Sequence, residues 1–484
     1  QADHRWPAPA VIITIAAVSE PLDVLSEALA GTDGFTELRY HDKSTRTVSV
    51  EKAKVEATGY RRRGGVGVRV LEGGRWGSAS TSRLDVESVR KAAARARNAA
   101  RANAGKTGEK LTELPPVELA RGEFDQPGLE EAAGRTLEER IVMASELEAG
   151  MRKAGSRVSS ASCSYNEIFE HKAIVTSDGA RAAFRLVRPE LRLQAVAERD
   201  GQLSSGFESV GATGGWDCLF RAGSGQSLAE KAARTATDLL SARHPEGGKA
   251  TVILAPSIVG LLVHEAIGHT TEADFVQAGS VAAGKLGTRV ASELVTLVDS
   301  GSSEFYPGAG GTIPVDDEGV VAGRTTIIDA GILTSYLHNR QSAAKFGVTP
   351  TGNARAWEYS DEPLIRMRNT YLEPGRSTLE EMIASTENGY LLDGPRNGQA
   401  DATGEFMFAV QEARRIERGK LGELVRGVTI SGIAFEVMST VDAISDTFRW
   451  DLGSGYCGKG QPAKVDAGGP YVRCRATIGG VQTG

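Results

Sequence analysis

The chain has 484 residues, which is too many for one compact core, so we expect two or three domains. Its formal net charge is −6, and 56 Lys and Arg residues are mixed with 62 Asp and Glu residues along the sequence. No basic stripe that could follow a phosphate backbone is visible, which argues against nucleic acid as a partner. No apolar run approaches the roughly 20 residues that a membrane-spanning helix needs, so no membrane partner is expected.

The four cysteines do not make a disulfide framework in a chain of this length, and their spacing is typical of reduced thiols in a cytoplasmic protein. Three of them, Cys163, Cys218 and Cys474, are expected to be small apolar core residues. Glycine is abundant, with 58 residues scattered through short alternating apolar runs. This composition favours many turns and antiparallel strands.

Residues 1–20 are expected to form a leader or an extension before the first domain. The apolar run from Val11 to Val18 is superficially similar to a signal peptide, but Asp3, Trp6 and the prolines nearby fit that interpretation badly.

We predict an N-terminal α/β domain over residues 21–243. In chain order the pattern predicts a helix over 22–29, paired strands over 36–51, a hairpin over 66–76, a helix over 85–102 and a connector near 105–117. A helix from Thr136 to Lys153 begins with a capping box formed by Thr136 and Glu139. Strands follow around residues 174 and 191–196, and a second capping box, Ser227 with Glu230, predicts a helix that reaches about residue 242.

The clearest domain boundary is the segment 244–248, His-Pro-Glu-Gly-Gly. We therefore predict a β-rich catalytic domain over residues 249–484, with strands over 325–328, 428–437 and 471–478. One strongly apolar helix lies near its start. The predicted fold class is α+β, in which the N-terminal α/β domain precedes a larger β-rich domain that carries the metal-binding helix.

The segment 264–269, His-Glu-Ala-Ile-Gly-His, continues an apolar run that follows a buried strand and Pro256. Zinc peptidases commonly place two histidines at i and i+4, with a glutamate between them as general base. Here the spacing is i and i+5, which leaves the two imidazoles roughly 140° apart on a regular helix. A π-bulge would realign them, so we predict a widened turn between Ala266 and His269, tolerated by Gly268.

A catalytic zinc ion needs three protein ligands and one open position. The third ligand could be a nearby carboxylate, Glu272 or Asp274, but Cys457 is the strongest distant candidate, because the glycine-rich loop 453–462 around it allows close approach. A thiolate ligand makes a bound water less acidic, so Glu265 has more to do as proton acceptor. The alternative for the two histidines is that they are hydrogen-bonded residues of the core. The alternative for Cys457 is a packed thiol that binds no metal.

Several motifs in one order make the chain resemble the TldD/PmbA family, often labelled modulator of DNA gyrase, and its metal-bearing TldD branch in particular. The resemblance covers roughly residues 21–484. The motifs are Gly64-Gly65-Val66-Gly67-Val68-Arg69, the segment 264–269, Pro314-Val315-Asp316-Asp317-Glu318-Gly319, Pro350-Thr351-Gly352-Asn353-Ala354-Arg355, Arg368-Asn369-Thr370 and Cys457-Gly458-Lys459.

The resemblance implies a zinc metallopeptidase that acts on small or unfolded peptides, with His264, His269 and Cys457 as ligands and Glu265 as the catalytic base. One zinc ion per chain is expected, and iron is the alternative metal. The resemblance also implies a dimer around the active site, either a homodimer or a heterodimer with a metal-free TldE/PmbA-type chain. Two other functions stay open: an amidase that cuts one small-molecule amide in a biosynthetic pathway, and a non-enzymatic regulatory subunit.

Two further groups of polar residues are candidates for binding. Asp316, Asp317 and Glu318 could bind a second cation, but a solvated turn is the simpler interpretation. A second group could bind substrate carbonyls or a terminal carboxylate, and structural hydrogen bonding is an equal alternative for it. This group consists of His338, Asn339, Arg340, Asn353 and Arg355.

Overall fold

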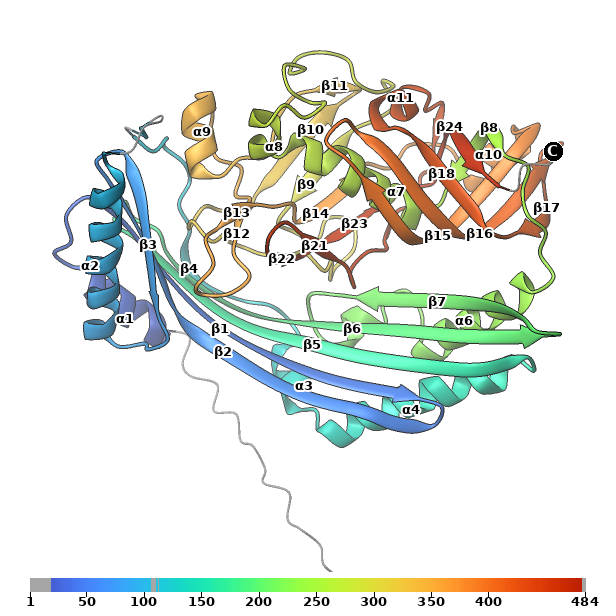
Figure 1. The fold of residues 1–484 in the computed structure, drawn as a ribbon, viewed down its shortest axis with the longest axis horizontal. Helices are drawn as coiled ribbons and strands as arrows, with labels where there is room; N and C mark the ends of the chain where they lie inside the picture. Colours follow the sequence, from blue (N-terminus) through green and yellow to red (C-terminus); the bar gives the residue numbers. More distant parts are fainter. Residues whose placement is uncertain (1–18, 106–109, 112, 481–484) are drawn as a thin grey trace, which may run out of the picture.

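The computed structural model describes residues 19–105, 110–111 and 113–480 (Figure 1). Residues 1–18 of the predicted leader and residues 106–109 and 112 of the predicted connector lie outside the described residues. None of the helices in the described part is long and apolar enough to cross a membrane. All four cysteines are free thiols.

The N-terminal part is built on a seven-stranded sheet with the order β3-β2-β1-β5-β6, in which both β4 and β7 pair with β6. Only the β4–β6 pair is parallel, so the expected α/β arrangement is wrong for this sheet and the fold is α+β. The strands are β1 (Phe35–Glu51), β2 (Lys54–Glu72), β3 (Arg75–Thr81), β4 (Arg121–Asp125), β5 (Val158–Thr176), β6 (Arg181–Arg199) and β7 (Gln202–Gly211).

The segment 36–51 was expected to form paired strands, but it lies in the single long strand β1. No glycine or proline occurs between Phe35 and Glu51, so nothing in the sequence turns the chain there. The hairpin between β2 and β3 is confirmed, with Gly73 and Gly74 both at positive φ in the turn. Positive φ is the conformation that glycine adopts without steric cost.

Among the described residues, six helices accompany this sheet. The capping box of Thr136 with Glu139 is confirmed at the start of α4. The second predicted capping box is wrong, because Ser224 is the N-cap of α6 and its side chain accepts a hydrogen bond from the Ser227 amide. Ser227 therefore already lies in the first helical turn. The helices are α1 (Ser19–Leu29), α2 (Val86–Asn103), α3 (Leu129–Gly134), α4 (Leu137–Ala154), α5 (Trp216–Leu219) and α6 (Gly225–Leu239).

The C-terminal part contains a small barrel and a six-stranded sheet. In the barrel, β15-β8-β24-β18-β16 form a ring that the pairing of β16 with β15 closes, while β17 and β19 attach to its rim. The predicted strand 428–437 is too long, because the chain turns into helix α11 (Ala434–Ser439) after Ile433. The strands are β8 (Gly248–Leu254), β15 (Asn388–Ala400), β16 (Glu405–Glu417), β17 (Lys420–Val425), β18 (Val428–Ile433), β19 (Ala443–Ile444) and β24 (Val472–Gly479).

The six-stranded sheet has the order β11-β10-β9-β14-β23-β20 and lies beside the helix that carries the histidine motif. Two small hairpins, β12–β13 and β21–β22, complete this part, together with the short helices α9 (Arg340–Phe346) and α10 (Leu379–Ala384). The remaining strands are β9 (Leu297–Ser300), β10 (Arg324–Asp329), β11 (Ile332–Leu333), β12 (Ala354–Arg355), β13 (Leu364–Ile365), β14 (Asn369–Leu372), β20 (Arg449–Trp450), β21 (Tyr456–Gly458), β22 (Pro462–Lys464) and β23 (Asp466–Gly469).

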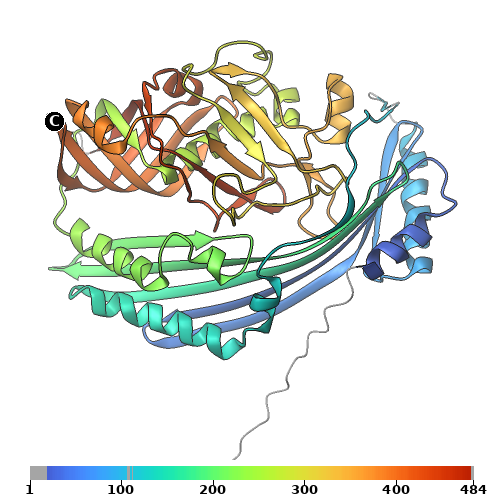
Figure 2. The same ribbon diagram turned by 180° about the vertical axis from the view of Figure 1, so that it is seen from behind.

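The long N-terminal sheet curves around the C-terminal part, and α3 and α4 lie on the opposite face of the sheet (Figures 1 and 2). Charged side chains from the sheet meet the C-terminal part in buried ion pairs. Lys172 Nζ lies 2.9 Å from the Asp317 carboxylate, and Lys464 Nζ lies 2.6 Å from that of Glu190. These pairs connect β5 and β6 to the loops around the site described below.

The turn that contains Asp316, Asp317 and Glu318 is buried, so the expectation of a solvated turn is wrong. Asp316 accepts hydrogen bonds from three backbone amides, and Glu318 lies 2.7 Å from Arg69 of β2. A buried carboxylate needs such partners to offset the loss of hydration. Asp317 and Glu318 therefore join the two parts of the chain, and Asp316 fixes the backbone of the turn.

Candidate metal centre

The histidine motif lies on a helix that changes its winding. Strand β8 leads into α7 (Pro256–Leu262), which begins with the proline and continues as a π-helical turn, η1 (Val263–Gly268). The His269 amide donates to the His264 carbonyl, five residues earlier, which is the hydrogen bond that defines a π-turn. The predicted widening between Ala266 and His269 is confirmed, and a 3₁₀ turn, η2 (His269–Thr271), follows it.

Gly268 has ordinary helical dihedral angles, φ −54° and ψ −53°, so the bulge does not depend on its conformational freedom. Its missing side chain is what the structure requires, because a Cβ there would lie 2.0 Å from Met367 Sδ. The segment before β14 packs directly against the π-turn at this point.

The structure brings together the three residues predicted as metal ligands. The candidate ligand atoms of His264, His269 and Cys457 all lie within 4.8 Å of one another. The Cys457 Sγ lies 2.9 Å from His269 Nε2, and the two imidazole rings are nearly perpendicular, with their centroids 5.2 Å apart. Cys457 is on β21, which pairs with β22, so a tight hairpin presents the sulfur to the π-turn.

The donor set fits a bound metal ion. Both ring nitrogens of His264 are buried and have no hydrogen-bond partner among the described residues. A buried polar atom without a partner is costly, and a cation between the three ligands would remove that cost. Two imidazoles and a thiolate suit zinc and leave a fourth position for water or substrate.

The Glu265 side chain lies next to this cluster and keeps contact with solvent. Its Oε2 is 3.8 Å from His269 Nε2, and about a third of the side chain is exposed. Glu265 is therefore placed where it can exchange a proton with a molecule bound at the cluster.

The cluster favours the charged forms of its members. Burial alone would raise the pKa of the Cys457 thiol, but the adjacent imidazoles of His264 and His269 outweigh it and lower the pKa to about 5. Burial alone would lower the pKa of His269, but the carboxylate of Glu272 and the sulfur of Cys457 raise it to about 10. Cys457 is thus held as a thiolate, the form that binds metals.

Glu272 does not belong to the three-residue cluster, although its position near the histidines made it a candidate ligand. Its Oε2 lies 3.2 Å from Nδ1 of His269, on the side of the ring away from Cys457. Its second neighbour is Lys459, whose Nζ donates to Oε2 at 2.8 Å. Sequence reasoning missed this link, although Lys459 follows the cysteine by two positions and Glu272 follows the histidine by three.

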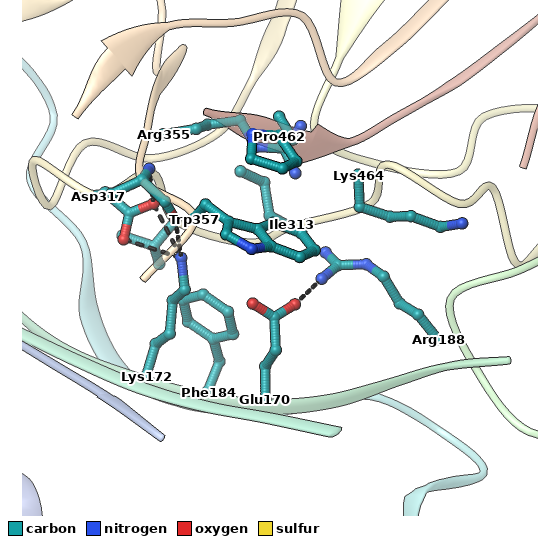
Figure 3. A pocket seen from close by; sticks show the side chains of 13 residues that line it. Glu170, Lys172, Phe184, Arg188, Ile313, Asp317, Arg355, Trp357, Pro462 and Lys464 are labelled. Carbon is teal, nitrogen blue, oxygen red and sulfur yellow. Dashed lines mark hydrogen bonds and ion pairs between the residues drawn. The ribbon is translucent and has the colours of Figure 1, made fainter. Parts of the chain in front are cut away.

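A small cavity of about 20 Å³ lies beside the Cys457 hairpin, between β5, β6 and the C-terminal loops (Figure 3). Its lining includes Pro462, Ala463 and Lys464 of β22, and Arg355 from the predicted substrate-binding group. Figure 3 shows the carboxylate of Glu170 paired with Arg188, and that of Asp317 paired with Lys172.

Arg355 differs from the other lining cations, because its guanidinium forms no ion pair with any described residue. Its NH1 donates to the Met367 carbonyl at 2.8 Å. Burial, together with the nearby cations Arg188 and Arg366, lowers the pKa of Arg355 to about 9. The structure thus leaves a buried positive charge at the cavity.

The other four residues of the predicted substrate-binding group do not line this cavity. Asn339 caps α9 through the Ser342 amide, and His338 Nδ1 lies 3.1 Å from the Ser342 hydroxyl. Arg340 pairs with Asp178 of the N-terminal part. Asn353 is fully buried and donates to Asp299 at 2.8 Å. These contacts fix the surrounding loops, and substrate binding by these four residues stays a prediction.

Comparison with known proteins places the chain in one family along most of its length. The PmbA/TldA metallopeptidase domain 1 matches residues 36–100, the central domain of that family matches 130–240, and its C-terminal domain matches 247–480. A metalloprotease of Methanothermobacter thermautotrophicus is 34% identical, over 92% of this chain and 95% of the relative.

One further relative matches about half of the chain, and one solved structure has the same fold. A zinc metalloprotease TldD homolog of Saccharolobus solfataricus is 38% identical, over 48% of this chain and 51% of the relative. The crystal structure of TldE from Thermococcus kodakarensis has the same fold, with a TM-score of 0.77 at 19% identity, and the match covers 96% of this chain and all of that chain. The chain therefore belongs to the PmbA/TldD metallopeptidase family.

Proposed function

We propose that this protein is a zinc-dependent peptidase that hydrolyses amide bonds in small or unfolded peptides. The convergence of His264, His269 and Cys457 within 4.8 Å is the observation that carries the proposal. The name of the zinc metalloprotease homolog from Saccharolobus solfataricus supports zinc as the metal. A zinc ion bound by these ligands would supply a Lewis acid that polarises the scissile carbonyl and makes water more acidic.

Glu265 is the proposed general base and acid. Its partly exposed carboxylate, next to the ligand cluster, can take a proton from the attacking water. It can then donate that proton to the leaving amine, which must be protonated to depart. The thiolate of Cys457 would reduce the net positive charge of a bound zinc ion, so a water molecule at the centre would be less acidic and would depend more on Glu265.

Arg355 is the proposed contact for a substrate oxygen. It contributes a buried guanidinium without an ion pair to a cavity that has room for a group the size of a water molecule. A carboxylate or carbonyl oxygen there would gain a charge-assisted hydrogen bond. The remainder of an extended peptide could add to the edge of a sheet, which would read its backbone and allow broad specificity.

The proposed assembly is a dimer, either of two copies or with a metal-free chain of the TldE/PmbA type. The close structural match to TldE over nearly the whole chain supports a shared shape for the two kinds of subunit. Light scattering of the purified chain, alone and mixed with such a relative, would distinguish the two assemblies.

The proposed activity is tested by incubating the purified chain with a mixture of unstructured peptides, followed by mass spectrometry. We expect cleavage that a chelator abolishes and that added Zn²⁺ restores. Cleavage of one small amide, and of none of the peptides, would favour a dedicated biosynthetic amidase. Absence of any chelator-sensitive hydrolysis with the metal bound would contradict the peptidase and favour a non-enzymatic regulatory subunit.

A further inference from the structure

The carboxylate of Glu272 is completely buried and lies between an imidazole and an ammonium group. Its Oε2 accepts hydrogen bonds from His269 Nδ1 at 3.2 Å and from Lys459 Nζ at 2.8 Å. A carboxylate can only accept, so Nδ1 of His269 carries the proton. When the ring is neutral, as a metal ligand must be, its lone pair is on Nε2, the nitrogen that faces Cys457.

Lys459 connects this carboxylate to the hairpin that carries the sulfur. It follows Cys457 by two positions, in the loop between β21 and β22. Besides Glu272, its Nζ donates to Asp274 at 2.8 Å and to the carbonyl of Ile365 at 3.1 Å. One ammonium group thus joins the Cys457 hairpin, the start of α8 (Ala273–Gln277) and strand β13.

We propose that Glu272 and Lys459 are positioning residues for the metal centre. Glu272 holds the His269 ring with Nε2 toward the ion. Lys459 binds Glu272 and thereby fixes the position of the Cys457 hairpin relative to that ring. The inference rests on the metal centre of the proposed function and adds the two residues that orient its ligands. Both residues act through a metal ligand or the hairpin that carries one, so neither is assigned a catalytic role.

The arrangement explains why a carboxylate lies in a fully buried position. A buried carboxylate is tolerated when it is paired and hydrogen-bonded, and Glu272 has an imidazole on one side and an ammonium on the other. Carboxylate partners of metal-binding histidines fix the orientation of the ring and increase its basicity as a ligand. Loss of such a partner typically weakens metal binding by about 10- to 100-fold.

Asp274 offers a matched control. Its carboxylate lies 2.7 Å from the same ammonium group but is nearly half exposed. Among the described residues, Asp274 forms an ion pair with Lys459 alone. Glu272→Gln removes the negative charge beside His269, whereas Asp274→Asn removes a charge beside Lys459 alone. Lys459→Met removes the ammonium, and Lys459→Arg keeps the positive charge.

The test is the apparent dissociation constant for Zn²⁺ of the purified full chain, measured by competition with a chromophoric chelator. The absorption of the Co²⁺-loaded protein reports the thiolate contact separately. We expect Glu272→Gln and Lys459→Met to weaken Zn²⁺ binding by about 10- to 100-fold and to alter the Co²⁺ spectrum. Asp274→Asn should stay near the wild type, and Lys459→Arg should recover part of the loss.

The outcomes separate this inference from the proposed function. If the wild type binds no Zn²⁺, the metal centre itself is wrong. If the wild type binds Zn²⁺ and both Glu272→Gln and Lys459→Met bind it equally tightly with the same Co²⁺ spectrum, the positioning role is wrong while the metal centre stands. Circular dichroism of each apo variant establishes that it is folded, and Lys459→Met decides the question if Glu272→Gln does not fold.

Discussion

The sulfur of Cys457 lies 2.9 Å from Nε2 of His269, although 188 positions separate the two residues in the chain. The contact joins a π-helical turn that follows the barrel strand β8 to a short hairpin near the C-terminus. Neither segment can hold a metal ion with three ligands alone. The centre therefore depends on the tertiary fold, which brings these two segments together.

Replacement of Glu265 by glutamine should lower turnover by about 10²- to 10⁴-fold, the range typical for loss of a general acid–base group. The metal content should stay unchanged, because Glu265 is not among the three ligands. Peptide cleavage rates and elemental analysis of the same preparation measure both quantities. A fully metal-loaded Glu265→Gln variant with the wild-type rate would contradict the assignment of the base.

Replacement of Gly268 by alanine should destabilise the protein by about 1–3 kcal/mol, the usual cost of overpacking a core. The added Cβ would meet Met367 Sδ at 2.0 Å, so the buried side chain of Met367 must move. Denaturant unfolding measures the change, and Gly323→Ala is the control, since a Cβ there meets nothing within 4 Å. The double variant Gly268→Ala/Met367→Ala should lose less stability than the sum of the losses in the two single variants. Strictly additive losses would argue against the contact.

His41 on β1 should make stability depend on pH. Burial lowers its pKa from 6.5 to about 4, so the folded protein keeps the imidazole neutral where the unfolded chain takes up a proton. Its contribution is complete above about pH 6.5 and is lost as the pH falls toward 4, a change on the order of 3 kcal/mol. Urea unfolding of His41→Gln across this range should show a weaker pH dependence than the wild type.

A His41→Gln profile that parallels the wild type from pH 7 to pH 4 would show that His41 takes up its proton equally in both states.

Replacement of Arg355 by methionine should raise the KM for peptides by about 10-fold or more and change kcat little. A hydrogen bond to a charged group contributes about 1.5–3 kcal/mol, and a contact made equally in the ground and transition states appears in KM. Arg355→Lys should recover part of the affinity, because it keeps the charge. Steady-state kinetics of the wild type, Arg355→Met and Arg355→Lys measure these changes. An unchanged KM in Arg355→Met would show that Arg355 does not bind the substrate.

Local sequence signals predicted much of the centre. The i and i+5 spacing of His264 and His269 is incompatible with two aligned ligands on a regular helix, so the spacing itself predicted the π-turn that the structure contains. Glycine-rich surroundings pointed to Cys457. The capping box of α4 was also predictable from the local sequence, because its donors and acceptors lie within four residues.

Features that depend on distant partners were missed. The burial of Asp317 follows from its contact with Lys172, 145 positions away, and the Lys459–Glu272 link spans 187 positions. Glu272 also looks like a possible ligand from its spacing, and only the fold shows it on the far side of the His269 ring. Polar side chains in a loop carry no local mark that distinguishes a buried ion pair from a solvated turn.

The most direct test of the central claim is elemental analysis of the purified protein combined with anomalous diffraction at the zinc edge, for the wild type and for Cys457→Ser. The account predicts one zinc ion per chain, bound by His264, His269 and the Cys457 sulfur, and a marked loss of zinc in the variant. A wild-type crystal grown with Zn²⁺ that shows no anomalous peak between these three side chains would contradict it.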